Sequence, residues 1–266
     1  MEFVSELYPG ENLDDFASEP AVGRGRSPRD WTIVPYGRLP GASTFSGTLI
    51  PRNQWDALIE EKERNKSRLS DLRLRKKIPS LHQGQTEFCW TNAVISAMMI
   101  VQAQQGGRIV PLSPASVAAP LTNYTQIPSQ QRGFGGKALD YIVNQGVCSQ
   151  TIWPPNAIDR NLDNAQSMSD SKKHKITDWL EIPSRSFNHL MTLLLRGTPV
   201  VMGLNDWMGT GYGHEVCGLD PVKLSGSGNY GVRIWNSYGD SWKNQGMDVL
   251  PERYATPDDA VAPGAV

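Results

Sequence analysis

The sequence predicts an α+β protein in which a helical first half is followed by an antiparallel β half. Apolar segments with helical periodicity run from about residue 80 to 157, and short strand-like runs separated by Gly, Asp and Ser turns run from about 175 to 250. Helices first and strands second are typical of two facing subdomains rather than of alternating βαβ units. The chain has 266 residues, of which 39% are hydrophobic, so it can bury a substantial core.

Net charge and hydropathy argue against nucleic-acid and membrane partners. Lys plus Arg number 26 and Asp plus Glu 27, which leaves a net charge of −1 and no overall field that attracts phosphates or anionic lipids. The longest apolar run, around residues 93–103, is well short of the roughly 20 residues that a membrane span needs. The basic stretch at residues 62–77 lacks interleaved aromatic residues for base stacking, which favours a solvated face or a linker.

The cysteines and the first residues predict an intracellular protein. Cys89, Cys148 and Cys217 are an odd number without CxxC spacing, which argues against a disulfide framework and against a zinc site. The chain opens with acidic residues and shows no secretory signal. We therefore expect a reducing compartment, no metal and no other cofactor.

Residues 1–70 are expected to form an extended N-terminal arm with one helix. Residues 1–50 are rich in Pro, Gly and Ser and lack periodicity, and an acidic tip precedes several arginines, a charge pattern that favours a docking segment. Such a segment has few means of folding alone. Residues 53–69 predict one amphipathic helix, and a second unit is expected at 71–266.

The remaining elements follow from apolar periodicity and from polar or glycine boundaries. A helix over residues 88–104 is apolar around most of its circumference, which indicates burial inside the core. Further helices are expected at 114–119, 137–144 and 187–196, the last ended by Gly197, with a surface connection at 161–175; strands are expected at 199–203, 215–219, 230–234 and 247–250.

Cys89 is the cysteine with a reason to be reactive. It stands where a glycine-containing loop enters the buried helix, and the unpaired N–H groups and the macrodipole at a helix N-terminus favour a thiolate. Cys148, at the end of a helix, and Cys217, within a predicted strand, are expected to be structural.

His214 is the candidate base beside such a nucleophile. It follows a glycine-rich turn and opens a strand, so its ring can be presented where two subdomains meet. The other three histidines have structural explanations in a loop, a charged run and an amphipathic helix. Asn236 follows the next apolar strand and is placed to hold the second nitrogen of the His214 ring.

In this order the residues resemble the papain-like cysteine peptidases. The resemblance covers roughly residues 71–250, and the histidine and the asparagine follow the cysteine at about the family's spacing. It implies a two-lobed fold with a helical lobe at about 80–157 and a β lobe at about 175–250. The motifs that carry it are Gln83-Gly84, Cys89-Trp90, Gly135-Gly136, Gly213-His214, and Asn236-Ser237 with Gly239 and Trp242.

The resemblance implies a catalytic role for four residues. Cys89 would be the nucleophile, and His214, oriented by Asn236, would be the general base that later protonates the leaving amine. Gln83 would donate its side-chain amide, together with the Cys89 backbone N–H, to the tetrahedral oxyanion.

Three further matches imply contacts in the cleft. Gly135 and Gly136 match the glycines whose main chain pairs with an extended peptide, because a missing Cβ allows the close approach. Trp242 matches the aromatic cover over the asparagine and histidine pair.

The sequence also departs from the family near the site. Thr86, Glu87 and Phe88 replace a cysteine and two small residues before the nucleophile, where Glu87 and Phe88 would obstruct the primed side of the cleft. Glu215 replaces the alanine that normally lines the main specificity pocket. A carboxylate there either favours a basic substrate side chain or stabilises the charged form of His214.

Two functions follow from these residues. The leading one is a cysteine endopeptidase acting on a peptide or protein substrate, with residues 1–70 either a propeptide or a permanent docking arm. The alternative is a non-catalytic or carried component of a large assembly such as a virus particle, which would use residues 1–50 to dock on other subunits.

Overall fold

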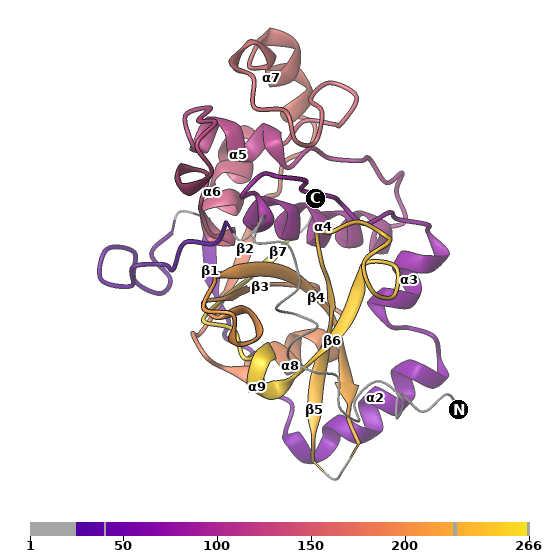
Figure 1. Ribbon diagram of the computed structural model, residues 1–266. Helices are drawn as coiled ribbons and strands as arrows, with labels where there is room; N and C mark the ends of the chain where they lie inside the picture. The colour runs from indigo at the N-terminus through magenta and orange to yellow at the C-terminus, as the bar shows by residue number, and fades with distance from the viewer. Residues whose placement is uncertain (1–24, 40, 226–227, 265–266) are drawn as a thin grey trace.

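A β-sheet and the buried helix α4 organise the chain (Figure 1). The computed structural model describes residues 25–39, 41–225 and 228–264. In chain order its elements are β1 (Ala42–Thr44), η2 (Arg52–Gln54), α2 (Trp55–Arg64), α3 (Leu69–Arg75), α4 (Cys89–Gln104), α5 (Ala115–Leu121), η3 (Pro128–Gln130), α6 (Gly135–Gln145), η4 (Arg160–Leu162), α7 (Ala165–Ser171), β2 (Trp179–Ile182), α8 (Phe187–Leu195), β3 (Val200–Leu204), η5 (Trp207–Gly209), β4 (His214–Lys223), β5 (Tyr230–Trp235), β6 (Met247–Pro251), α9 (Glu252–Ala255) and β7 (Asp259–Pro263).

The sheet separates two hydrophobic cores. Its seven strands, counted over the described residues, run in the order β1-β2-β7-β3-β4-β5-β6, and only β1 and β2 pair in parallel. Alternate side chains face opposite sides, so Val201 and Cys217 pack on the α4 side while Val200 and Met202 pack on the α8 side. Figure 1 shows α4 and α8 on these two sides. The expected order of a helical part and then a mostly antiparallel sheet is confirmed.

Helix α4 forms where the sequence predicts it and is buried almost all round. Within α4 only Val101 and Gln104 are not buried. Helices α5, α6 and α7 form the rest of the helical part; α5 and α7 lie beyond α4 from the sheet (Figure 1), whereas α6 also contacts β3 and β7. Helix α8 ends as expected before Gly197, whose φ of 79° suits a residue without a Cβ.

The region before α4 contains two helices where the sequence predicts one. The expected helix at residues 53–69 is interrupted at Lys66, which has a φ of 50°. A new helix, α3, begins at Leu69, because the buried carboxylate of Asp220 on β4 accepts the backbone N–H groups of Leu69 at 2.7 Å and Ser70 at 3.3 Å. Helix α3 therefore crosses the boundary expected between residues 70 and 71.

Several further elements, among them α7, β2 and β7, lie where the sequence predicts no helix or strand. Helix α7 occupies part of the expected surface connection at 161–175, and a capping box between Asn164 and Ser167 starts it. Strands β2 and β7 have too few β-branched residues for a strong strand pattern. Since β7 lies between β2 and β3, the β part of the chain extends to Pro263 rather than to 250.

The described part of the N-terminal arm is folded onto its own chain. The backbone of Arg26 forms an isolated parallel β-bridge with that of Gly133, and β1 pairs with β2. Trp55 is fully buried on the α8 side of the sheet. Docking of residues 1–50 on another subunit stays a prediction, and residues 1–24 lie outside the described residues.

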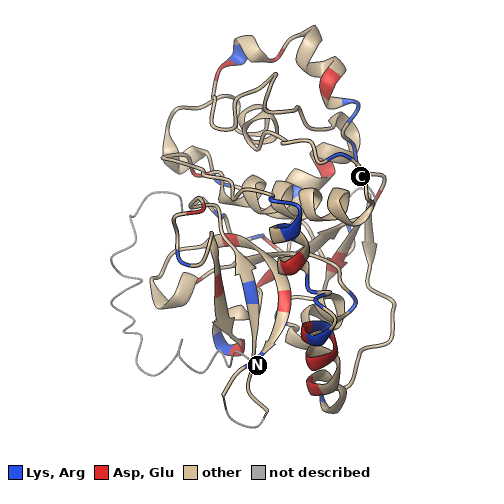
Figure 2. Ribbon diagram, turned by 90° about the vertical axis from the view of Figure 1, so that its right-hand side faces the viewer, with Lys and Arg blue, Asp and Glu red and all other residues tan. Residues whose placement is uncertain are grey.

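Charges of both signs are interspersed along the described ribbon (Figure 2). The basic stretch at 62–77 is mostly exposed on α2, α3 and the segments that follow them. Arg73 is the exception, because it is buried with its guanidinium 4.5 Å from the Trp235 ring centroid and 2.7 Å from Asp240. No described helix has the length and apolar character that a membrane span requires.

The contact between Asp220 and the start of α3 gives a test of the fold. We expect Asp220→Ala to lower the free energy of unfolding by about 1–3 kcal/mol, because it leaves two backbone N–H groups without their buried acceptor. Asp71→Ala is the matched control, since Asp71 stands in the first turn of the same helix but makes only a partly exposed pair with Arg68. The control is expected to change the free energy by less than about 1 kcal/mol in urea unfolding, and equal effects would contradict the assignment.

Candidate active site

Helix α4 places Cys89 at the base of the site. Cys89 is the first residue of α4 and is fully buried. Phe88 precedes it, also fully buried, and its carbonyl accepts hydrogen bonds from the side chains of Thr91 (3.1 Å) and Asn92 (2.8 Å). The Phe88 side chain belongs to the same hydrophobic core as Cys89, and its obstruction of the cleft stays a prediction.

Strands β4 and β5 place His214 and Asn236 side by side. His214 opens β4, and Asn236 follows the last residue of the neighbouring strand β5. His214 Nε2 lies 2.8 Å from Asn236 Oδ1, and the same oxygen accepts the Ser237 backbone N–H at 2.8 Å. Because Asn236 holds Nε2, proton exchange with a nucleophile has to use Nδ1 of His214.

Gln83 belongs to the same hydrogen-bond chain. Ser237 Oγ donates to Gln83 Oε1, and the Gln83 backbone N–H donates to the Ser237 carbonyl at 3.0 Å. The Gln83 side-chain amide donates to the Thr86 carbonyl at 2.9 Å, which engages one of its two hydrogens. The chain His214–Asn236–Ser237–Gln83 thus links the sheet to the loop before Cys89.

Aromatic rings enclose His214 on two sides. Trp207 lies with its ring centroid 4.8 Å from that of His214, and Tyr238 lies at 5.3 Å. Trp242 contacts Tyr238 at 5.9 Å, so it stands behind the ring that contacts the histidine. The sequence did not single out Trp207, whose position before the glycine-rich turn is its only signal.

The main chain of residues 25–27 lies across Cys89. Gly133 N–H donates to the Gly25 carbonyl at 3.0 Å, Ser27 N–H donates to the Gly133 carbonyl at 2.8 Å, and the Gly25 amide contacts the Cys89 sulfur. A Cβ on Gly25 would lie 1.6 Å from the Glu87 carbonyl oxygen, so only glycine allows this approach. The cleft at Cys89 is therefore filled by the arm.

Gly133, rather than the two glycines predicted from the resemblance, makes the backbone pairing with the arm. Gly135 N–H instead donates to Glu215 Oε1 at 2.8 Å, and a Cβ on Gly136 would lie 2.9 Å from Leu39. The sequence signal for Gly133 was a third glycine two positions before this pair.

Arg26 enters a pocket beside Cys89 that carries two acids. Arg26, Glu215 and Asp259 are each at most 3% exposed, and Arg26 Nη2 lies 4.0 Å from Asp259 Oδ2. Arg29 lies next to this pocket, where it forms an ion pair with Glu181 and lies 3.8 Å from Asp259. Asp259, which sequence reasoning missed, comes from the unexpected strand β7.

With the arm in place, the surroundings of Cys89 disfavour the thiolate form of its side chain. Burial raises the pKa of the Cys89 thiol, and the charge of Glu215 raises it further, while the backbone N–H groups of Glu215 and Gly25 act in the opposite direction. Burial is the largest of these effects in this arrangement, and the predicted preference of the helix N-terminus for a thiolate stays a prediction. Burial also raises the pKa of Asp259, and it raises the pKa of Glu215 to about 8 despite the opposing charge of Arg26.

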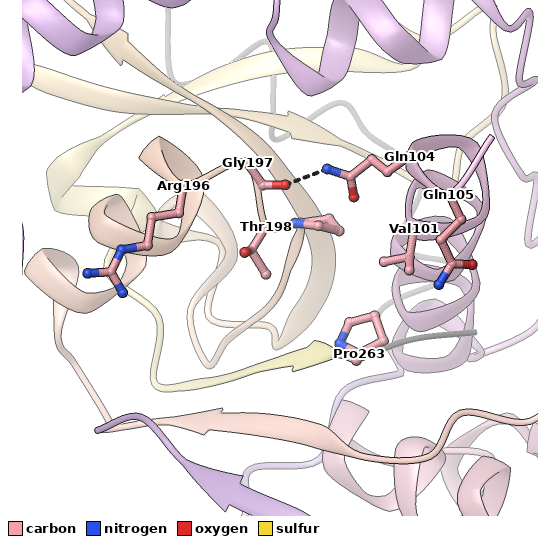
Figure 3. A pocket seen from close by; sticks show the side chains of 9 residues that line it. Val101, Gln104, Gln105, Arg196, Gly197, Thr198 and Pro263 are labelled. Atoms are coloured by element: carbon pink, nitrogen blue, oxygen red, sulfur yellow. Dashed lines mark hydrogen bonds between the residues drawn. The ribbon is translucent and has the colours of Figure 1, made fainter. Parts of the chain in front are cut away.

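An open groove lies at the far end of α4 from Cys89 (Figure 3). Gln104 and Gln105 face Arg196, Gly197 and Thr198 across it, and Gln104 Nε2 donates to the Gly197 carbonyl at 2.7 Å. None of the predicted catalytic residues lines this groove.

Known structures share this fold, although no protein-family model and no curated protein matches the sequence. The chain is similar to xylellain, a cysteine protease from Xylella fastidiosa, with a TM-score of 0.57 and 18% identity over 71% of this chain and 83% of that one. It is similar to the bromelain protease of Ananas comosus in complex with the E64 inhibitor, with a TM-score of 0.55 and 19% identity over 70% and 93%. A structure that addresses the mite allergens Blo t 1 and Der p 1 matches with a TM-score of 0.61 and 14% identity over 96% and 82%.

The chain therefore has the papain-like α+β fold of cysteine proteases, which confirms both the predicted fold class and the resemblance. At 14–19% identity the likeness establishes the fold.

The buried carboxyl of Glu215 gives a test through the pH dependence of stability. Because folding raises the pKa of Glu215 from 4.5 to about 8, the folded state holds an extra proton between these values, and stability falls as pH rises through this window. We expect Glu215→Gln to remove part of this fall, so that its stability relative to the wild type increases by more than about 1 kcal/mol from pH 5 to pH 8. Urea unfolding over this range measures the effect. Glu61→Gln, at an exposed position of α2, should leave the pH dependence unchanged, and parallel curves for Glu215→Gln would contradict the prediction.

Proposed function

We propose that the protein is a cysteine endopeptidase and that the arm holds it in a latent form. The observation that carries the proposal is the hydrogen-bond chain from His214 through Asn236 and Ser237 to Gln83, which orients a base and an oxyanion donor next to a buried cysteine. A purely structural protein would not need a histidine and a glutamine in one hydrogen-bond network beside a cysteine at the start of a helix.

Each residue of the site would have its own role in the hydrolysis of a peptide bond. His214 Nδ1 takes the proton of Cys89, and the sulfur attacks the carbonyl carbon of the scissile bond. The Cys89 backbone N–H and the Gln83 amide stabilise the negative charge on the carbonyl oxygen. His214 then protonates the leaving amine, and water, deprotonated by His214, releases the acyl group from the sulfur. Asn236 keeps the ring in the orientation that both proton transfers need.

Latency follows from the position of the arm. Gly25 contacts the Cys89 sulfur and leaves no room for a substrate carbonyl there, and burial raises the pKa of the thiol. Displacement or removal of residues 25–27 would expose the sulfur and relieve this burial. This supports the propeptide interpretation of the arm over a purely tethering one. The role as a carried component of a large assembly stays a prediction.

The first test is covalent labelling by E64, the inhibitor in the bromelain structure. We expect the full-length protein to label slowly at neutral pH and Gly25→Ala to label at least about tenfold faster, because the added methyl group cannot fit against Glu87 and displaces the arm. Intact-mass spectrometry over time measures the rate, and adding Cys89→Ala should abolish labelling.

Gly107→Ala is the control for labelling, since a Cβ at that position meets nothing within 4 Å. Equal rates for Gly25→Ala and the wild type would contradict latency. A folded Gly25→Ala protein that never labels would contradict the proposed nucleophile.

The second test concerns the base. In the Gly25→Ala background we expect His214→Ala to lower kcat/KM for peptide hydrolysis by at least about 100-fold, which is the usual contribution of a general base. His189→Ala is the control, because His189 lies on α8 and contacts Ser186 and Phe45 instead. Similar activity in the two variants would exclude His214 as the base.

A further inference from the structure

Two paired backbone segments carry the groups that flank His214 and Cys89. Residues 80–83 end at Gln83, and the loop 236–246 between β5 and β6 begins at Asn236. Two backbone hydrogen bonds of 3.0 Å and an antiparallel bridge join the segments, in the pairs Gly239–Leu81, Gln83–Ser237 and His82–Tyr238. The register of this pairing therefore determines how the oxyanion donor lies relative to the group that orients the histidine.

The hydroxyl of Ser80 joins the two segments. It accepts hydrogen bonds from Trp235 Nε1 at 2.6 Å and from Arg73 Nη2 at 2.9 Å, and it donates to the Gln245 carbonyl at 3.2 Å. One donor and two acceptor positions are all that a serine hydroxyl has. A Cβ on Gly246 would lie 1.9 Å from this oxygen, so only glycine lets the loop approach so closely.

Arg73, on helix α3, holds the chain on both sides of Asn236. Its guanidinium carbon lies 4.5 Å from the ring centroid of Trp235, the residue directly before Asn236. Arg73 Nη2 also donates at 2.7 Å to Asp240, further along the same loop, and the Ser80 backbone N–H donates to the same carboxylate oxygen at 2.9 Å. One side chain thus fixes the start and the middle of the loop against the segment that leads to Gln83.

Stability alone does not account for a buried arginine at this position. Arg73 is 1% exposed, and within the described residues its Nε and Nη1 atoms have no hydrogen-bond partner. Burial lowers the pKa of Arg73, and the charge of Asp240, which is half exposed, acts in the opposite direction. Burying a cation with incomplete hydrogen bonding is unfavourable. What a guanidinium supplies here is a rigid plane that stacks on a ring and donates in fixed directions.

We propose that Arg73 is a positioning residue of the active site. It keeps the loop that begins at Asn236 in register with the segment that ends at Gln83. The proposal rests on the proposed peptidase function. Because Arg73 acts through the backbone of these segments and lies outside the catalytic group, its loss lowers the rate of bond cleavage more than it weakens substrate binding.

The first experiment compares variants of Arg73 in the full-length Gly25→Ala chain. The substrate is the peptide that this chain cleaves fastest in an internally quenched library. We expect Arg73→Ala to lower kcat at least about tenfold and to change KM by less than about twofold, because small displacements of catalytic groups are costly for the rate. Arg73→Lys keeps a cation beside Asp240 and Trp235, and it should recover at least about threefold of the lost kcat.

Arg75→Ala is the matched control. Arg75 lies on the same helix and has the same charge, but it is exposed and donates only to the Lys66 carbonyl. The control should leave kcat and KM unchanged. A loss of kcat in Arg73→Ala no larger than in the control would overturn the proposal, and so would a rise in KM that accounts for the whole loss of kcat/KM.

Hydrogen exchange followed by mass spectrometry separates positioning from a general loss of stability. In Arg73→Ala we expect faster exchange in peptides that cover residues 80–83 and 236–246, and unchanged exchange in α8, because only the pairing of the two segments is released. Faster exchange throughout the chain would overturn the proposal. If the Gly25→Ala parent cleaves no peptide and E64 does not label Cys89, the peptidase function fails, and the local change in exchange still supports the role of Arg73 in fixing the register.

Discussion

The site depends on how helix α4 is packed against the sheet. Almost every position of α4 is buried, and the side chains of β3 and β4 that face it belong to the same core. A close-packed interior does not allow such a helix to slide or rotate without opening cavities. The packing therefore fixes the end of α4 that carries Cys89 relative to the start of β4 that carries His214. The hydrogen bonds through Asn236, Ser237 and Gln83 then adjust side chains on a frame that is already rigid.

Buried charge makes the arm and the β-sheet depend on each other. Glu181, Glu215 and Asp259 lie on three strands of one sheet, where ionised carboxyls are unfavourable without cations. Arg26 and Arg29 supply the positive charge from a segment that lacks the periodicity of a stable element. The buried acids thus stabilise the position of the arm on the sheet. The arginines of the arm in turn lower the free-energy cost of burying these acids.

The sequence predicted the parts of the molecule that local patterns determine. Apolar periodicity predicted the burial of α4, and apolar runs between turn residues predicted four strands. The order of the motifs predicted that His214, Asn236 and Gln83 lie together. The sequence did not predict Asp259, Gly133 or the placement of Arg26, because each takes its role from residues distant in the chain. The raised pKa of Cys89 was missed for the same reason, since it depends on burial in the folded chain and on the charge of Glu215, which is distant in the sequence. Tertiary contact overrides local propensity most where a weakly patterned segment meets a functional surface.

The contacts that hold the arm on the sheet also keep Cys89 covered. Arg26 and Arg29 pair with acids in the interior, and the same segment places Gly25 against the Cys89 sulfur. Because the arm belongs to the same chain, its effective concentration at Cys89 exceeds that of most free peptides. The activity of the proposed peptidase would therefore be governed by whatever displaces or removes residues 25–27.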